Sequence, residues 1–205
     1  MRTGSVTPGE ALAAECARYT AMGWMRGTSG NLSVVVDRDP LRLAVTVSGK
    51  DKGELTPDDV VIVDAEGGTD DPVRVPSAEA GLHGRIAAVA GAGAVVHVHA
   101  LAPVVAAEFW PEGVELHDLE MLKGFGRQAH ESVVIPVVPN SQDMRVLGDA
   151  FEAGFRKDVP ALIVARHGVY VWGDDLYQAR HRLECLEWLL RFKTETTQRG
   201  NPPRT

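Results

Sequence analysis

The sequence predicts an α/β protein in which helices cover both faces of a mostly antiparallel central sheet. Strand-like runs come in pairs joined by short turns, as at 32–36 and 41–47. Segments with helical periodicity separate the strands, as from 77 to about 89 and at 142–154, and two more flank them, from Thr7 to about Arg26 and from Asp174 to about Thr196. Hairpins alternating with helices in this way favour three α/β/α layers.

Length and composition are those of an ordinary globular protein. The 205 residues are enough for a single domain over 1–205, with a frayed tail from about residue 196. Hydrophobic residues make up 44% of the chain and charged residues 24%, as in most soluble proteins. The net charge of -7 offers no basic surface, which argues against nucleic acid as a partner.

Targeting and redox signals are also absent from the sequence. The first ten residues lack an apolar signal segment, and the apolar stretch 94–107 is interrupted by histidines and Pro103. No run therefore reaches the roughly 18 apolar residues of a membrane span. The two cysteines, Cys16 and Cys185, predict no disulfide scaffold. We expect a cytoplasmic protein that acts away from membranes.

In the first half of the chain, Pro8 and Glu10 follow Thr7 at the start of the first predicted helix. After the hairpin we expect a further strand at 60–63 and a helix from 77 to about 89, capped by Ser77. A strand over 94–100 and a short helix from Pro103 follow. Residues 111–131 are expected to be irregular.

The second half begins with a predicted strand at 133–138 and a helix at 142–154. Two more strands are expected at 161–165 and 169–172, separated by a turn at His167-Gly168. The long C-terminal helix completes the predicted architecture.

Two histidines, His97 and His99, stand two residues apart in the apolar run 94–100. Side chains alternate faces along a strand, so both imidazoles point the same way. Buried imidazoles cost free energy unless a metal or hydrogen-bond partners satisfy them. A third candidate ligand, His167, directly follows the apolar strand at 161–165. The three histidines suggest a divalent metal site, and separately satisfied core histidines are the alternative.

Two glycine-containing loops, Gly27–Asn31 and Ser48–Lys50, are rich in hydroxyl and amide groups. Backbone N–H groups in such loops can hold an anion without net positive charge. Lys50 and Lys52 can add a point charge for a phosphate. Taken alone, each loop is explained more simply by ordinary turn chemistry.

Two glutamates are candidates for acid–base chemistry. Glu79 lies near a helix start in Pro76-Ser77-Ala78-Glu79, four residues before His83, a pattern that also fits a helix cap and a surface pair. Glu120 lies in the irregular segment among apolar neighbours. Such a setting can raise the pKa of a carboxyl group and suit it to proton transfer.

Together these motifs resemble the class II aldolase/adducin family over about residues 9–195. The resemblance implies a class II aldolase-like fold and a divalent metal, usually zinc at one ion per subunit, held by His97, His99 and His167. It also implies homotetramers with active sites near subunit boundaries. Contacts to a substrate phosphate would come from Asn31, Ser48, Gly49 and Ser77, with Lys52 as a nearby charge. Family aldolases often have a second serine where this chain has Ala78.

Two segments are similar to those of one branch, the methylthioribulose-1-phosphate dehydratases. His117–Gly124 looks like their H-x-E-M-x-K-G stretch with one extra residue, and Arg166–Gly173 reads RHGVYVWG, as theirs does. This resemblance implies a zinc-dependent lyase of methionine salvage that converts 5-methylthioribulose 1-phosphate to 2,3-diketo-5-methylthiopentyl 1-phosphate. Glu120 would be the base, and Glu79, which matches the acid/base glutamate of the aldolases, would sit beside the metal.

Two other functions are compatible with the same family. A sugar-phosphate aldolase would use the same metal and Glu79 for retro-aldol cleavage of a ketose 1-phosphate. A non-catalytic adducin-like binding protein would be expected to have lost metal ligands, whereas all three histidines are present here.

Overall fold

The computed structural model describes residues 6–198, and nine strands lie within them. They are β1 (Asn31–Arg38), β2 (Leu41–Thr46), β3 (Val60–Asp64), β4 (Ala94–Val98), β5 (Val114–His117), β6 (Ser132–Ile135), β7 (Val137–Val138), β8 (Ala161–Val164) and β9 (Gly168–Gly173). Seven form one sheet in the order β3-β2-β1-β4-β9-β8-β7, while β5 and β6 pair separately. Only the β7–β8 pair in the described sheets is parallel, which confirms the mostly antiparallel sheet.

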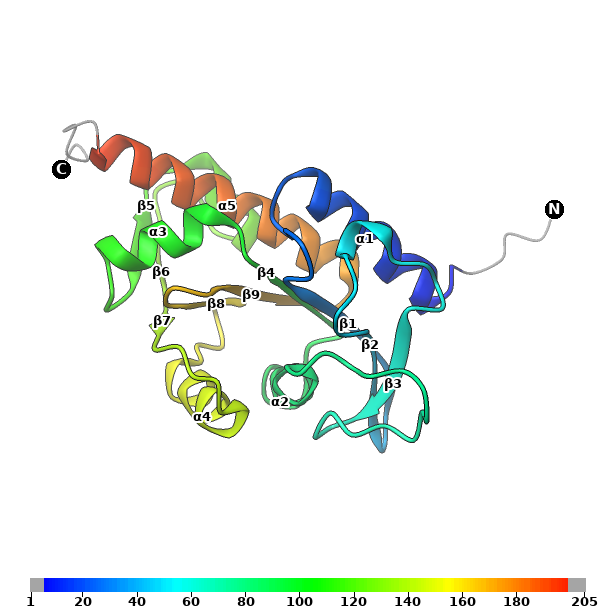
Figure 1. Cartoon of the computed structure of the whole chain (residues 1–205). Helices are drawn as coiled ribbons and strands as arrows, with labels where there is room; N and C mark the ends of the chain where they lie inside the picture. The colour runs from blue at the N-terminus through cyan, green and yellow to red at the C-terminus, as the bar shows by residue number, and fades with distance from the viewer. Residues whose placement is uncertain (1–5, 199–205) are drawn as a thin grey trace.

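Helices cover both faces of the seven-stranded sheet. They are α1 (Pro8–Ala21), α2 (Ala80–Ala90), α3 (Leu101–Phe109), α4 (Met144–Gly154) and α5 (Leu176–Gln198), with two short 3-10 helices, η1 (Lys52–Glu54) and η2 (Glu120–Phe125). Figure 1 shows α1, α3 and α5 on one face and α2 and α4 on the other. The predicted three-layer arrangement is therefore confirmed. None of the helices in residues 6–198 has the length and apolarity to cross a bilayer.

Each helical layer buries its own apolar core against the sheet. On the α1/α3/α5 side the core includes Leu12, Leu32 and Leu183. On the α2/α4 side it includes Ile86 and Phe151. Burying each such side chain contributes about 1.5–3 kcal/mol relative to exposure, so both helical layers stabilise the sheet.

The first helix begins as the sequence predicts but ends early. Thr7 accepts from the Glu10 backbone N–H at 3.2 Å, and the Glu10 carboxylate accepts from the Thr7 N–H at 2.7 Å. This reciprocal capping box fixes the start of α1. The helix stops at Ala21, not near Arg26, because Gly23 has a left-handed φ of 74° and turns the chain.

Three expected elements differ in detail. Residues 111–131 are not irregular, because β5 and η2 lie within them. The expected strand at 133–138 is split between two sheets, since Pro136 has no N–H to continue a ladder. The expected C-terminal helix continues past about 196 to Gln198, and residues 199–205 of the expected tail lie outside the described part of the chain.

The second helix also begins later than predicted. Ser77 is tied to the sheet by its backbone N–H, which donates to the Thr46 carbonyl at 3.2 Å, so α2 starts only at Ala80. Ser77 is therefore not the cap; the cap position is Glu79, whose side chain makes no capping bond. This leaves the Glu79 carboxylate free to face the sheet.

Candidate active site

Three histidines converge at one end of the seven-stranded sheet. His97 Nε2 lies 2.9 Å from His99 Nε2 and 3.3 Å from His167 Nε2. One ligand atom from each residue lies within 4.8 Å of the others, which suits a single metal ion. Within the described residues no other group of three or more metal-ligating side chains meets this criterion.

Hydrogen bonding and burial favour the neutral form of His97 and His99. His97 Nδ1 lies 3.1 Å from the Val169 carbonyl, which can only accept, so Nδ1 carries the proton and Nε2 presents its lone pair. Burial, and then the neighbouring His99 and His167, hold the pKa of His97 well below its usual value. Burial followed by His167 also lowers the pKa of His99.

The three histidines come from a strand, a strand end and a turn. His97 lies in β4, whereas His99 follows its last residue and is fixed by a 2.9 Å bond from its N–H to the Trp24 carbonyl. His167 lies in the turn between β8 and β9, after Arg166 in a left-handed conformation with φ of 56°. The pairing of β4 with β9 brings this turn beside His97, although 70 residues separate them.

Two glycines allow the backbone to approach the cluster. A Cβ on Gly168 would lie 2.4 Å from the Val98 carbonyl oxygen and 3.1 Å from ring carbons of His97 and His99. A Cβ on Gly30, whose φ is 78°, would lie 2.9 Å from the His97 carbonyl oxygen. Neither position has room for a side chain.

Glu79 is the carboxylate beside the histidines. One of its oxygens lies 3.4 Å from His97 Nε2 and the other 3.4 Å from His167 Nε2. Asn31 Nδ2 donates to Glu79 Oε2 at 2.6 Å and holds it in place. The carboxylate is nearly buried, so the surface-pair interpretation of Glu79 and His83 is wrong. A carboxylate in this position can exchange a proton with a molecule bound at the metal.

Sequence reasoning missed two residues around Glu79. Ser33 Oγ lies 2.7 Å from His83 Nδ1, and Tyr170 stacks on His97 with ring centroids 4.0 Å apart. Ser33 stands two residues after Asn31 on the same face of β1, a period-two signal that could have found it. Tyr170 is brought in by strand pairing, for which the sequence carries no local signal.

The five residues expected to bind phosphate do not all lie together. Ser48 and Ser77 flank an antiparallel bridge between Val47 and Pro76, which brings their two segments together at the end of β2, beside Gly49. Asn31 is engaged with Glu79. Lys52 is only 2% exposed, and its Nζ donates to the carbonyls of Thr28 at 3.1 Å and Lys50 at 3.0 Å. Lys52 thus joins the two glycine loops.

The expected apolar environment of Glu120 is wrong. Its side chain is 77% exposed and pairs with Lys123 at 3.4 Å. Leu122 and Phe125 of the same 3-10 helix turn inward, which leaves Glu120 facing outward. No hydrogen bond or ion pair observed in residues 6–198 joins it to the histidine cluster.

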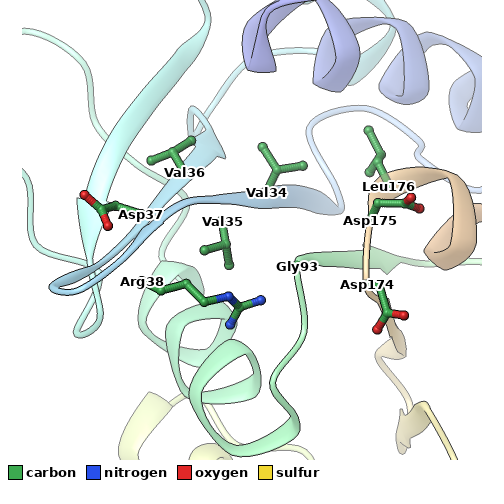
Figure 2. A pocket seen from close by; sticks show the side chains of 9 residues that line it. All are labelled: Val34, Val35, Val36, Asp37, Arg38, Gly93, Asp174, Asp175 and Leu176. Carbon is green, nitrogen blue, oxygen red and sulfur yellow. The ribbon is translucent and has the colours of Figure 1, made fainter.

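A pocket of about 500 Å³ lies at the other end of β1 and β4, where Gly93 precedes β4, the strand that carries His97 (Figure 2). Its polar groups serve local structure. Arg38 donates to the carbonyls of Gly91 and Ala92, and Asp175 accepts from the Gln178 N–H at the start of α5. This pocket is thus separate from the histidine cluster.

Comparison with known proteins agrees with this architecture. The chain belongs to the class II aldolase and adducin family, since the model of the "Class II Aldolase and Adducin N-terminal domain" matches residues 10–194. Within it, the methylthioribulose-1-phosphate dehydratase of Bacillus cytotoxicus is 35% identical over 84% of this chain and 82% of its own. That of Sulfurihydrogenibium sp. is 37% identical over 83% of this chain and 81% of its own.

Solved structures share the fold. An L-fuculose-1-phosphate aldolase from Thermus thermophilus superposes with a TM-score of 0.73 at 22% identity, covering 94% of this chain and 97% of its own. A second L-fuculose 1-phosphate aldolase gives 0.77 at 22% identity, covering 100% and 92%. The predicted class II aldolase-like fold is confirmed.

The close approach at Gly168 makes metal binding sensitive to one methyl group. Gly168→Ala forces Val98, His97 or His99 to move, so we expect metal content per subunit to fall to less than half that of the wild type. Metal analysis of the dialysed protein checks this. Gly91→Asn is the matched control, because Gly91 is left-handed with nothing within 4 Å. Full metal content in Gly168→Ala would contradict the steric argument.

Acid should destabilise the metal-free protein through His83. Burial lowers the pKa of His83 to about 3, so below pH 6.5 the unfolded chain binds a proton that the native chain does not. Stability is thus lost as pH falls from 6.5 towards 3, by up to about 1.4 kcal/mol per pH unit from this group.

His83→Asn keeps a polar atom for Ser33 and removes the titration. Urea unfolding at pH 7, 6 and 5, at one protein concentration, should therefore show a shallower acid loss in the variant. Equal slopes in the two proteins would disprove the assignment to His83.

Proposed function

We propose that this chain is a lyase that dehydrates 5-methylthioribulose 1-phosphate to 2,3-diketo-5-methylthiopentyl 1-phosphate, a step of methionine salvage in the cytoplasm. One observation carries the proposal: the Glu79 carboxylate lies 3.4 Å from two of three converging imidazoles. The relatives that share about 35% identity over most of the chain are dehydratases of that name.

The donor set fits zinc, which we propose at one ion per subunit. Three neutral imidazoles that leave a coordination position open are typical of catalytic zinc, and here the lone pair of His97 Nε2 is turned toward the other two rings. His97, His99 and His167 would hold the ion. When bound, it would act as a Lewis acid that polarises the substrate carbonyl and acidifies the adjacent C–H.

Two glutamates would move the protons. The resemblance implies Glu120 as the base, but we assign this role to Glu79, because Asn31 holds Glu79 beside the cluster; Glu79 takes the proton from C3. Glu120 gives a proton to the C4 hydroxyl, which leaves as water while the C3–C4 double bond forms. The resulting enol then tautomerises to the diketone, with the enol O–H proton lost and one gained at C4. The Ser48, Gly49 and Ser77 surface would hold the phosphate through neutral donors.

Glu120 requires a second subunit in this proposal. Its carboxylate is exposed and makes none of the described contacts with the histidines of its own chain. In the homotetramer that we propose, the exposed η2 of one subunit would face the histidine cluster of the next.

The test is to incubate the purified, metal-analysed protein with 5-methylthioribulose 1-phosphate and analyse products by mass spectrometry. We expect loss of 18 mass units with the carbon chain intact and one zinc per subunit. Dihydroxyacetone phosphate with an aldehyde would instead identify retro-aldol cleavage. Unchanged substrate in the presence of bound zinc would refute the dehydratase proposal.

The proposed shared site can be tested by mixing inactive subunits. Glu79→Gln and Glu120→Gln should each lower kcat about 10²–10⁴-fold while keeping zinc. Tetramers reassembled from equal amounts of both should regain about a quarter of wild-type kcat, because random mixing joins an intact Glu79 to an intact Glu120 at that fraction of boundaries. Activity no higher than that of either parent would show that the two carboxylates do not act across a boundary.

A further inference from the structure

Three buried polar atoms surround Glu79 without a hydrogen-bond partner in the described part of the chain. They are Asn31 Oδ1, His83 Nε2 and Tyr170 Oη. Their residues are 5%, 0% and 1% exposed, so solvent does not satisfy them. Unpaired buried polar groups cost free energy and are rare in native proteins. Their grouping around one carboxylate points to a role in the chemistry of that carboxylate.

Two side-chain hydrogen bonds join β1 to the start of α2. Asn31 Nδ2 donates to Glu79, and Ser33 Oγ bonds His83 Nδ1. Asn31 and Ser33 lie two residues apart, which along a strand spans about 6.6 Å. Glu79 and His83 lie four residues apart, which along a helix spans about 6 Å, so both hydrogen bonds can form at the same time. These two hydrogen bonds hold the start of α2, which carries Glu79, against the sheet.

Tyr170, on β9, lies on the same side of the sheet as these two hydrogen bonds. Asn31, His97 and Tyr170 form one register row across β1, β4 and β9, so their side chains share a face of the sheet. The Tyr170 ring stacks on His97 and meets the His83 ring edge-on at 5.8 Å. Burial and the negative Glu79 raise the pKa of Tyr170 well above its usual value, so its hydroxyl keeps a proton to donate.

Ser33, His83 and Tyr170 can each donate a hydrogen bond to the next group, in the order Ser33 to His83 to Tyr170 to Glu79. His83 is neutral, since burial lowers its pKa to about 3, and it carries a single N–H. When the Ser33 hydroxyl donates to Nδ1, that N–H stands on Nε2, the unpartnered atom. A tyrosine oxygen can accept from it, and a carboxylate can accept from the tyrosine.

We propose that Tyr170 is a positioning residue for Glu79: its hydroxyl donates to the Glu79 carboxylate, while His83, oriented by Ser33, donates to the Tyr170 oxygen. Asn31 supplies the second donor to the same carboxylate. Glu79 is then held by two donors from two strands before substrate binds. The kinetic part of this inference rests on the proposed dehydratase function.

The kinetic test is Tyr170→Phe, which keeps the ring on His97 and removes only the hydroxyl. We expect kcat for dehydration of 5-methylthioribulose 1-phosphate to fall about tenfold or more, with KM within about threefold and metal content unchanged, because a hydrogen bond to a charged group is lost. In a Glu79→Gln background the same change should have no further effect on kcat. Unchanged kcat in Tyr170→Phe, or an equal loss in both backgrounds, would overturn the proposal.

The matched control is Tyr19→Phe. The Tyr19 hydroxyl is likewise buried without a hydrogen-bond partner, but it lies in α1, away from Glu79. We expect this control to keep wild-type kcat. A loss equal to that of Tyr170→Phe would mean that removing any buried hydroxyl has the same effect, and would also overturn the proposal.

A second readout needs no turnover and separates this inference from the proposed function. With cobalt(II) in place of the native metal, Tyr170→Phe should shift the visible absorption spectrum when Glu79 is present and leave it unchanged in Glu79→Gln. If the wild type fails to dehydrate the substrate, the proposed function fails and the cobalt spectra still decide the role of Tyr170. Identical spectra with and without the hydroxyl, in the presence of Glu79, would refute it.

Discussion

The site depends on the position of β4, which pairs with β1 on one side and with β9 on the other. Because both neighbours are antiparallel to β4, Asn31, His97 and Tyr170 fall in one row and project from one face. The same pairing removes His97 wholly from water, which would be costly for an unsatisfied imidazole. The Val169 carbonyl on β9 and the two other imidazoles meet that requirement. Backbone register thus sets both the position of His97 and its tautomer.

The position of Glu79 is set by α2, which lies on the face of the sheet toward which His97 points. Because Ser77 stays bound to the end of β2, the helix begins at Ala80 and Glu79 is left at its cap position. A carboxylate at a helix start would ordinarily serve the backbone N–H groups. Here it makes no capping bond and is held by Asn31 instead, so its oxygens face the imidazoles.

Local patterns predicted much of this arrangement. Period-two alternation placed His97 and His99 on one side of a strand, and the turn after an apolar strand singled out His167. The role of Tyr170 was missed because it arises from the pairing of β9 with β4, about 70 residues earlier in the chain. Ser33 shares a strand face with Asn31, but its partner His83 lies on a helix 50 residues away, so its role was missed as well. The surroundings of Glu120 were predicted wrongly for a different reason, because a run of apolar neighbours does not show which side chains of a short helix turn inward.

The side chains of Glu79 and Glu120 differ in how much conformational freedom they retain in the folded chain. Glu79 is nearly buried and held by a 2.6 Å hydrogen bond, so its conformational entropy is already lost on folding. Exposed Glu120 retains that freedom in the single chain. A proton acceptor for a carbon acid gains most from a fixed position, because a small misplacement weakens the transition state. This difference supports the proposal that Glu79 takes the C3 proton, and that Glu120 acts in a step whose alignment depends on the proposed subunit assembly.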